Sequence, residues 1–148
     1  MSYKLLPKLV ALIIWSSQIF ATSAHANPAD LLPRFLVGCL WNTTILGQRL
    51  FFLLGPLGHA VNFGVLALLL AWAISDNPIL SPVKFRLALS GACLYALSDE
   101  VHQIFVPTRT FQVRDLIVDA LGALLGLYLF QWLKVLRTRK AESQSPLL

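Results

Sequence analysis

The chain has 148 residues, of which 57% are hydrophobic and 13% are charged, and it carries a net charge of +5. About 25% of the residues in an ordinary soluble domain are charged, so this composition excludes a soluble protein and indicates a small protein with several membrane spans. The basic residues flank apolar runs, as they do in membrane proteins, and we therefore expect membrane lipids and no nucleic acid as partners.

The first segment, residues 1–26, has two interpretations. Lys4 and Lys8 accompany a short apolar run, and the Ala-His-Ala of residues 24–26 ends it, which is typical of a cleaved signal peptide. The same pattern also describes a first transmembrane helix that is retained. Asn27 lies outside the cytoplasm in both interpretations, so the topology of the remaining chain does not depend on the choice.

Residues 27–56 alternate between apolar and polar patches. The apolar run from 35 to 46 is interrupted by Asn42, Thr43 and Thr44, which makes it too short for a span of about 20 residues. We therefore expect this segment to lie on the outer membrane surface as an amphipathic stretch.

Three further apolar segments, residues 57–74, 83–104 and 113–133, are candidates for membrane spans. They make up a core, residues 57–134, which is followed by a basic tail, residues 135–148. The sequence thus predicts an all-α fold. It is a polytopic membrane bundle of about four transmembrane helices, with the amphipathic segment outside.

The distribution of Lys and Arg predicts how this bundle is oriented. If the amino terminus is cytoplasmic, the cytoplasmic side holds eight of these residues: Lys4, Lys8, Lys84, Arg86, Lys134, Arg137, Arg139 and Lys140. The outer side holds the other four: Arg34, Arg49, Arg109 and Arg114. We therefore expect both termini in the cytoplasm and the loop before the last span outside.

Charge is concentrated between residues 95 and 119. Four of the seven acidic residues lie there with one histidine and two arginines: Asp99, Glu100, Asp115, Asp119, His102, Arg109 and Arg114. Ionisable residues at membrane depth mark a functional site by default. A helix starting at Phe85 would place Glu100 roughly 22 Å across a hydrocarbon core about 30 Å thick. A carboxylate at that depth should face the bundle interior and have a partner.

Asp115 and Asp119 are one turn apart in the last span, and Gly122 and Gly126 continue the same stripe. Small residues at this spacing let two helices approach closely. We expect a tightly packed seam next to the polar cluster, and the same glycines would suit an interface between two copies of the chain. Asp119 is assigned to this packing.

Several of these motifs resemble the VanZ-like family of bacterial membrane proteins. The resemblance rests on Ser-Asp-Glu-Val-His-Gln at 98–103, on Phe-Val-Pro at 105–107 with Arg109, and on Asp115 followed by the glycines. Trp-Ser-Ser-Gln at 15–18 resembles the end of the family's first span, which favours a retained first helix, and His59 with Phe63 resembles its second span.

Two residues depart from the family pattern, because Thr108 stands where the family usually has glycine and Asp119 where it usually has asparagine. The resemblance implies a multi-pass protein of the bacterial plasma membrane, linked to low-level resistance to teicoplanin, a lipid-tailed glycopeptide antibiotic. It does not imply a particular biochemical mechanism.

The first functional hypothesis is a recognition site for an amphiphile with an anionic or peptide head group, either a lipid-linked envelope precursor or a lipid-tailed glycopeptide. Its predicted residues are His59, Asp99, Glu100, His102, Gln103, Arg109 and Asp115. The planar guanidinium of Arg109 suits a phosphate or carboxylate. Equally, Arg109 could neutralise Asp99 or Glu100.

The second hypothesis is a membrane-embedded hydrolase with Asp99 or Glu100 as general base and His102 as proton carrier. The third is a purely structural module, so whether the chain is an enzyme stays open. We expect no metal or other cofactor, because no compact His/Glu ligand motif is present. An ion would otherwise find ligands in the same group of side chains: His59, Asp99, Glu100 and His102.

Overall fold

The computed structural model describes residues 5–25, 33–45, 48–75 and 80–143, and this part of the chain is almost entirely helical. Its elements in order are α1 (Leu5–Ser23), α2 (Arg34–Asn42), β1 (Thr44–Ile45), β2 (Gln48–Arg49), α3 (Leu50–Ile74), α4 (Pro82–Gln103) and α5 (Val113–Ser143). The two short strands pair antiparallel, with Thr44 opposite Arg49. The all-α fold expected from the sequence is confirmed.

Three helical stretches of the described chain are long and apolar enough to cross a membrane: Leu5–Ser23, Leu53–Ile74 and Val113–Lys140. α4 is not among them. It has 22 residues, but it carries two basic residues near its start and two acidic residues near its end. The chain is therefore a helical membrane protein with three such helices, where the sequence predicted about four spans.

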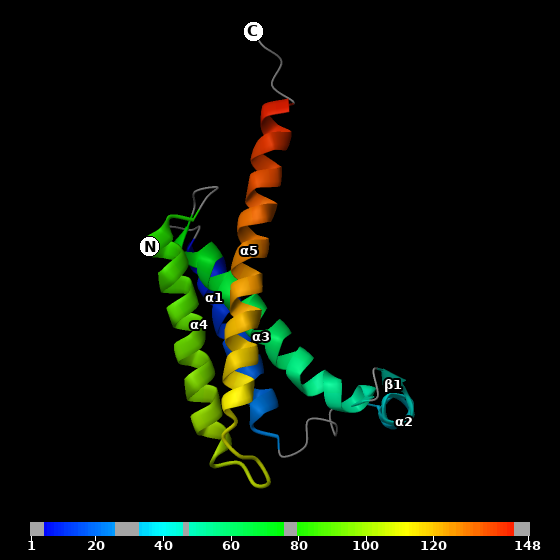
Figure 1. The fold of residues 1–148 in the computed structure, drawn as a ribbon. Helices are drawn as coiled ribbons and strands as arrows, with labels where there is room; N and C mark the ends of the chain where they lie inside the picture. Colours follow the sequence, from blue (N-terminus) through cyan, green and yellow to red (C-terminus); the bar gives the residue numbers. More distant parts are fainter. Residues whose placement is uncertain (1–4, 26–32, 46–47, 76–79, 144–148) are drawn as a thin grey trace.

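The long helices alternate in direction (Figure 1). α4 and α5 pack side by side and antiparallel, while α3 crosses α5 obliquely and α1 contacts α3 and α4. The C-terminal ends of α1 and α4 and the first turn of α5 consequently meet at one end of the bundle. The far end of α5 projects beyond the other helices at the opposite end (Figure 1).

Local sequence signals explain where α4 begins. Ser81 is its N-cap, and its Oγ accepts a hydrogen bond from the backbone N–H of Lys84 at 3.3 Å. Pro82 follows as the first helical residue, a position where the missing N–H costs no hydrogen bond. The predicted span at 83–104 therefore matches this helix to within one residue at each end.

The crossing of α3 and α5 is built on glycine. A Cβ atom added to Gly122 would collide with the backbone of Ala60, and one added to Gly126 would collide with the backbone of Gly64. The tightly packed seam predicted from the glycine stripe is thus present, and its partner is α3 of the same chain. Both glycines are buried by that packing, so they present no free surface to a second copy.

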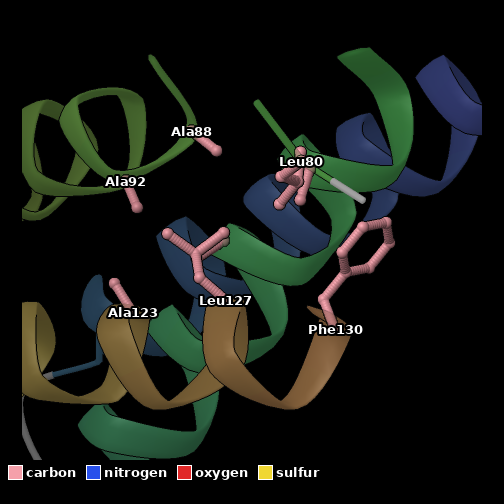
Figure 2. Close-up of a cluster of buried hydrophobic side chains, with 8 residues drawn as sticks. Leu80, Ala88, Ala92, Ala123, Leu127 and Phe130 are labelled. Carbon is pink, nitrogen blue, oxygen red and sulfur yellow. The ribbon is translucent and has the colours of Figure 1, made fainter. Parts of the chain in front are cut away.

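The apolar core lies beside this crossing (Figure 2). Ala123 and Leu127 of α5 face Ala88 and Ala92 of α4 there, and Phe130 of α5 lies toward Leu80. Leu127 is fully buried, and the two alanines of α4 are each 1% exposed. Small side chains on one helix thus accommodate large ones on the other, which is how close-packed interiors are built.

Two boundaries differ clearly from the sequence-based predictions. α3 begins at Leu50 and continues through Pro56, although the span was expected to start at residue 57. Pro56 is the seventh residue of this helix, where a proline removes one backbone hydrogen bond and crowds the carbonyl four residues earlier, so it resembled a start signal in the sequence. α5 extends to Ser143, so the tail expected from residue 135 is helical that far. Its Arg, Lys and Ala residues are good helix formers, which explains the extension.

The outer segment predicted for residues 27–56 contains α2, the two-stranded hairpin and the first turns of α3. Hairpins this short have too little periodicity to be recognised from the sequence. Residues 26–32, at the start of this segment, lie outside the described chain, as do residues 144–148 of the predicted tail.

Candidate functional site

The polar residues singled out by the sequence gather at the end of the bundle where α4 ends and α5 begins. Five of them are 5% exposed or less: Asp99, Glu100, Gln103, Asp115 and Asp119. The expectation that the carboxylates face the bundle interior is confirmed. Burying charges there is costly, so the partner of each group determines what the site can do.

Gln103 links two charged side chains. Its Nε2 donates to Asp99 Oδ2 at 3.2 Å, and its Oε1 accepts from Arg109 Nε at 3.1 Å and from Arg109 Nη2 at 2.7 Å. Arg109 is held in this way by an uncharged amide. Among the described residues Arg109 forms no ion pair, so it does not neutralise Asp99 or Glu100 directly.

Glu100 connects α4 to the loop before α5. Its Oε2 accepts a hydrogen bond from the backbone N–H of Gln112 at 2.7 Å. The residue is 0% exposed, and its Oε1 is buried without a hydrogen-bond partner among the described residues. One oxygen of this carboxylate is therefore fixed while the other remains available.

His59 reaches the site from α3 and pairs with Asp119 of α5. Its Nδ1 lies 3.1 Å from Asp119 Oδ1, and Asp119 is only 1% exposed. The acidic residue that stands where the family pattern has asparagine thus has a partner. Sequence reasoning assigned Asp119 to packing and omitted it from the site. Its spacing of one turn from Asp115 was the signal that could have included it.

Three helices each supply one potential metal ligand to the centre of the cluster. One ligand atom each from His59 of α3, Glu100 of α4 and Asp115 of α5 lie within 4.8 Å of one another. Asp115 Oδ1 also accepts from Arg114 Nε at 3.2 Å, although the Arg114 side chain is 67% exposed. An imidazole and two carboxylates can together exchange protons or bind a cation.

His102 lies apart from this group, although the sequence placed it beside Glu100. Two residues along a helix are separated by about 200°, so the two side chains lie on different faces. The His102 ring packs against Phe20 of α1, with 4.4 Å between ring centroids. Its Nδ1 is buried without a hydrogen-bond partner within the described ranges.

α1 is joined to the other helices close to the site. Tyr95 of α4 donates its hydroxyl to the backbone carbonyl of Ser16 at 2.7 Å, and Trp15 Nε1 donates to the carbonyl of Asn62 at 2.9 Å. Trp15 and Ser16 belong to the motif that resembles the family's first span. They contribute contacts between helices, and their side chains are not part of the polar cluster.

The geometry defines an all-helical membrane protein with a buried cluster of acidic, amide and imidazole side chains at one end of its bundle. A model of the VanZ/LLP1 family matches residues 6–134, which include α1, α3, α4 and most of α5. The chain belongs to this family. No curated protein and no solved structure matches it significantly.

Proposed function

We propose that this VanZ/LLP1-family protein recognises an amphiphile with an anionic head group at a site on the outer side of the bacterial plasma membrane. The ligand is either a lipid-linked envelope precursor or a lipid-tailed glycopeptide of the teicoplanin type. The observation that carries the proposal is the environment of Arg109.

Arg109 is a positively charged side chain that is positioned but not neutralised. Two of its nitrogens donate to Gln103 Oε1, which fixes the plane of the guanidinium. The side chain is partly buried, and within the described residues it forms no ion pair. A guanidinium held in this way can bind a phosphate or carboxylate with two hydrogen bonds.

The loop around Arg109 also exposes apolar side chains. Ile104 is 55% exposed, Phe105 79% and Val113 63%. Large apolar residues next to a cation are typical of a surface that lies at the membrane interface. An amphiphile would thus meet Arg109 with its head group while its tail stays in the lipid.

The proposal places this end of the bundle outside the cell, which requires α4 to cross the membrane as a fourth span. Its 22 residues would extend about 33 Å at 1.5 Å per residue, enough for the hydrocarbon core. Its outward face carries Leu87, Leu94 and Leu97, which are 45–67% exposed. Its acidic residues are buried against the other helices, so the lipid-facing side is apolar.

The resistance form of the proposal is tested by expressing the chain in a sensitive bacterium and measuring tolerance to teicoplanin and to vancomycin, a glycopeptide without a lipid tail. We expect the wild type to raise tolerance to teicoplanin selectively and Arg109→Ala to remove the effect. Arg109→Lys should retain little of it, because an ammonium lacks the planar fork. Arg139→Ala, an exposed arginine at the other end of α5, is the matched control.

The envelope-precursor form is tested by mass spectrometry of the lipids that copurify with the protein. A specific anionic lipid should accompany the wild type and Arg139→Ala and be depleted in Arg109→Ala. The recognition proposal is wrong if all variants confer the same tolerance and retain the same lipids at equal expression.

The His59–Asp119 pair favours a second candidate, a membrane-embedded hydrolase. Glu100 would act as general base toward water, and His59 would replace His102 as proton carrier, because His102 faces α1. Release of the head group from a long-chain lipid phosphate, lost in Glu100→Gln but retained in Arg139→Ala, would support this activity. Equal release by the wild type and Glu100→Gln would exclude it.

A further inference from the structure

The centre of the polar cluster has the composition of a metal site. The geometry points to a site for one divalent cation, of the type that accepts nitrogen and carboxylate ligands, such as Zn²⁺ or Mn²⁺, held by His59, Glu100 and Asp115. This inference goes beyond the proposed head-group recognition and does not depend on it, because the ion would bind to the free protein.

The three ligands come from three different helices and converge without a local sequence motif. Their ligand atoms lie within 4.8 Å of one another. Around a tetrahedral ion with metal–ligand distances of about 2.1 Å, neighbouring ligand atoms are about 3.4 Å apart. Side-chain rotations that move each ligand atom by roughly an ångström would close the site around an ion, and the helix backbones would stay in place.

Glu100 provides an independent reason to expect a ligand. The residue is fully buried, and the backbone N–H of Gln112 holds its Oε2 at 2.7 Å. Its Oε1 is also buried, with no hydrogen-bond partner among the described residues. A buried carboxylate oxygen without a partner is costly, and coordination to a cation would satisfy it.

The charges around the site favour a cation. Carboxylates come from α4 and α5: Asp99, Glu100, Asp115 and Asp119. Of the nearby arginines, Arg114 donates to Asp115 and to Gln112 Oε1, and Arg109 is directed to the amide of Gln103. Glu100 itself therefore has no ion pair within the described ranges. A divalent ion would neutralise Glu100 and Asp115 together.

Asp119 would act as a positioning residue for the histidine ligand. Its Oδ1 engages His59 Nδ1 at 3.1 Å, which leaves Nε2 as the ring nitrogen that can bind an ion. Metal-binding histidines almost always have a carboxylate, carbonyl or water on the other ring nitrogen. Such a partner fixes the tautomer and the orientation of the ring.

The test uses the full chain purified in lipid nanodiscs, stripped with a chelator and then supplied with Zn²⁺, Mn²⁺ or Co²⁺ alone. We expect one ion per chain by elemental analysis, a higher unfolding temperature with the ion, and visible absorption bands from bound Co²⁺. Glu100→Gln and Asp115→Asn should each lose stoichiometric binding. His25→Gln, which removes an exposed histidine at the end of α1, controls for surface binding and should retain the ion.

Asp119→Asn separates positioning from ligation. It should still bind the ion, with an affinity lowered about 10- to 100-fold, as is typical when a partner of a ligand is changed. Absence of a stoichiometric ion and of Co²⁺ bands in the wild type would overturn the inference, and this measurement needs no variant to fold. Equal affinity of the wild type, Glu100→Gln and Asp115→Asn would overturn it as well.

Discussion

Thr108 lies in the loop that carries Arg109, and its backbone is in the left-handed region with φ of 68°. This conformation is unfavourable for a β-branched residue and is normally adopted by glycine. In the family pattern glycine is the usual residue at this position, and the φ value supplies the physical reason for that preference. In this chain the loop therefore contains a strained residue one position before the proposed ligand-binding arginine.

Replacing this residue should stabilise the protein. Thr108→Gly removes a left-handed penalty of about 1–2 kcal/mol and adds unfolded-state entropy worth about 0.4–1 kcal/mol, so we expect a net gain of about 0.5–1 kcal/mol. Denaturant unfolding in detergent measures it. Thr110→Gly, two residues along, has no such strain to relieve and should not stabilise. Equal or lower stability of Thr108→Gly would contradict the strain argument.

The partner of His59 gives a second prediction about single residues. Asp119→Asn keeps a hydrogen-bond acceptor opposite His59 Nδ1, whereas Asp119→Ala leaves the half-buried imidazole without one. We expect the unfolding free energy of the asparagine variant to lie within about 1 kcal/mol of the wild-type value. The alanine variant should be about 1–3 kcal/mol less stable than the asparagine variant. The unfolding free energies measure the difference. Similar losses in both variants would show that the hydrogen bond contributes little.

Individual site residues could be identified from the sequence because a carboxylate in an apolar segment is costly and has to be buried with a partner. That reasoning located Asp99, Glu100, Gln103 and Asp115. It did not identify which partners they have. That Arg109 binds the amide of Gln103, and that His59 rather than His102 lies near Glu100, depends on how the helices face one another.

Among the helices, the crossing of α3 and α5 depends on the absence of side chains at two positions. The repeat of small residues in α5 predicted a close approach, but it could not indicate whether the partner was another helix of this chain or a second copy. The structure assigns it to Ala60 and Gly64 of α3. Only the three-dimensional packing contains that information.

Adding one methyl group should therefore separate these two helices. Gly126→Ala places a Cβ against the backbone of Gly64, where no flexible side chain can move aside, and we expect a loss of about 1–3 kcal/mol. Gly58→Ala is the matched control, because nothing lies within 4 Å of its added Cβ. That variant should gain about 0.5–1 kcal/mol from the better helix former. Thermal unfolding of both variants in detergent compares them, and equal stabilities would refute the tight crossing.

For the whole molecule, the contacts of Arg109 bear on the choice between a binding site and a structural module. A structural module predicts that site substitutions lower stability and activity in parallel. Within the described residues, the Arg109 side chain donates only to the side-chain amide of Gln103 at the end of α4, so its removal should leave the helix packing intact. We expect Arg109→Ala to lose teicoplanin tolerance at a thermal midpoint close to that of the wild type. A parallel loss of both would favour the structural module.

The topology of the chain follows from whether α4 crosses the membrane. If α1, α3 and α5 crossed and α4 did not, the loop with Arg109 would share one side with the start of the chain, whereas in the fold the start of α1 and that loop lie at opposite ends of the bundle (Figure 1). If α4 also crosses, the loop is outside and both ends of the chain are in the cytoplasm. The buried position of Asp99 and Glu100 and the excess of basic residues at the opposite end support the second arrangement.

Single cysteines placed at Thr110 and Thr138, in a background without Cys39 and Cys93, show on which side of the membrane the Arg109 loop and the end of α5 lie. Both positions are exposed, one in the Arg109 loop and the other near the end of α5. With α4 across the membrane, a membrane-impermeant thiol reagent should modify Thr110→Cys in intact cells and Thr138→Cys only after permeabilisation. The reverse pattern would place the Arg109 loop in the cytoplasm and invert the predicted orientation, and the site could then not meet an antibiotic arriving from outside.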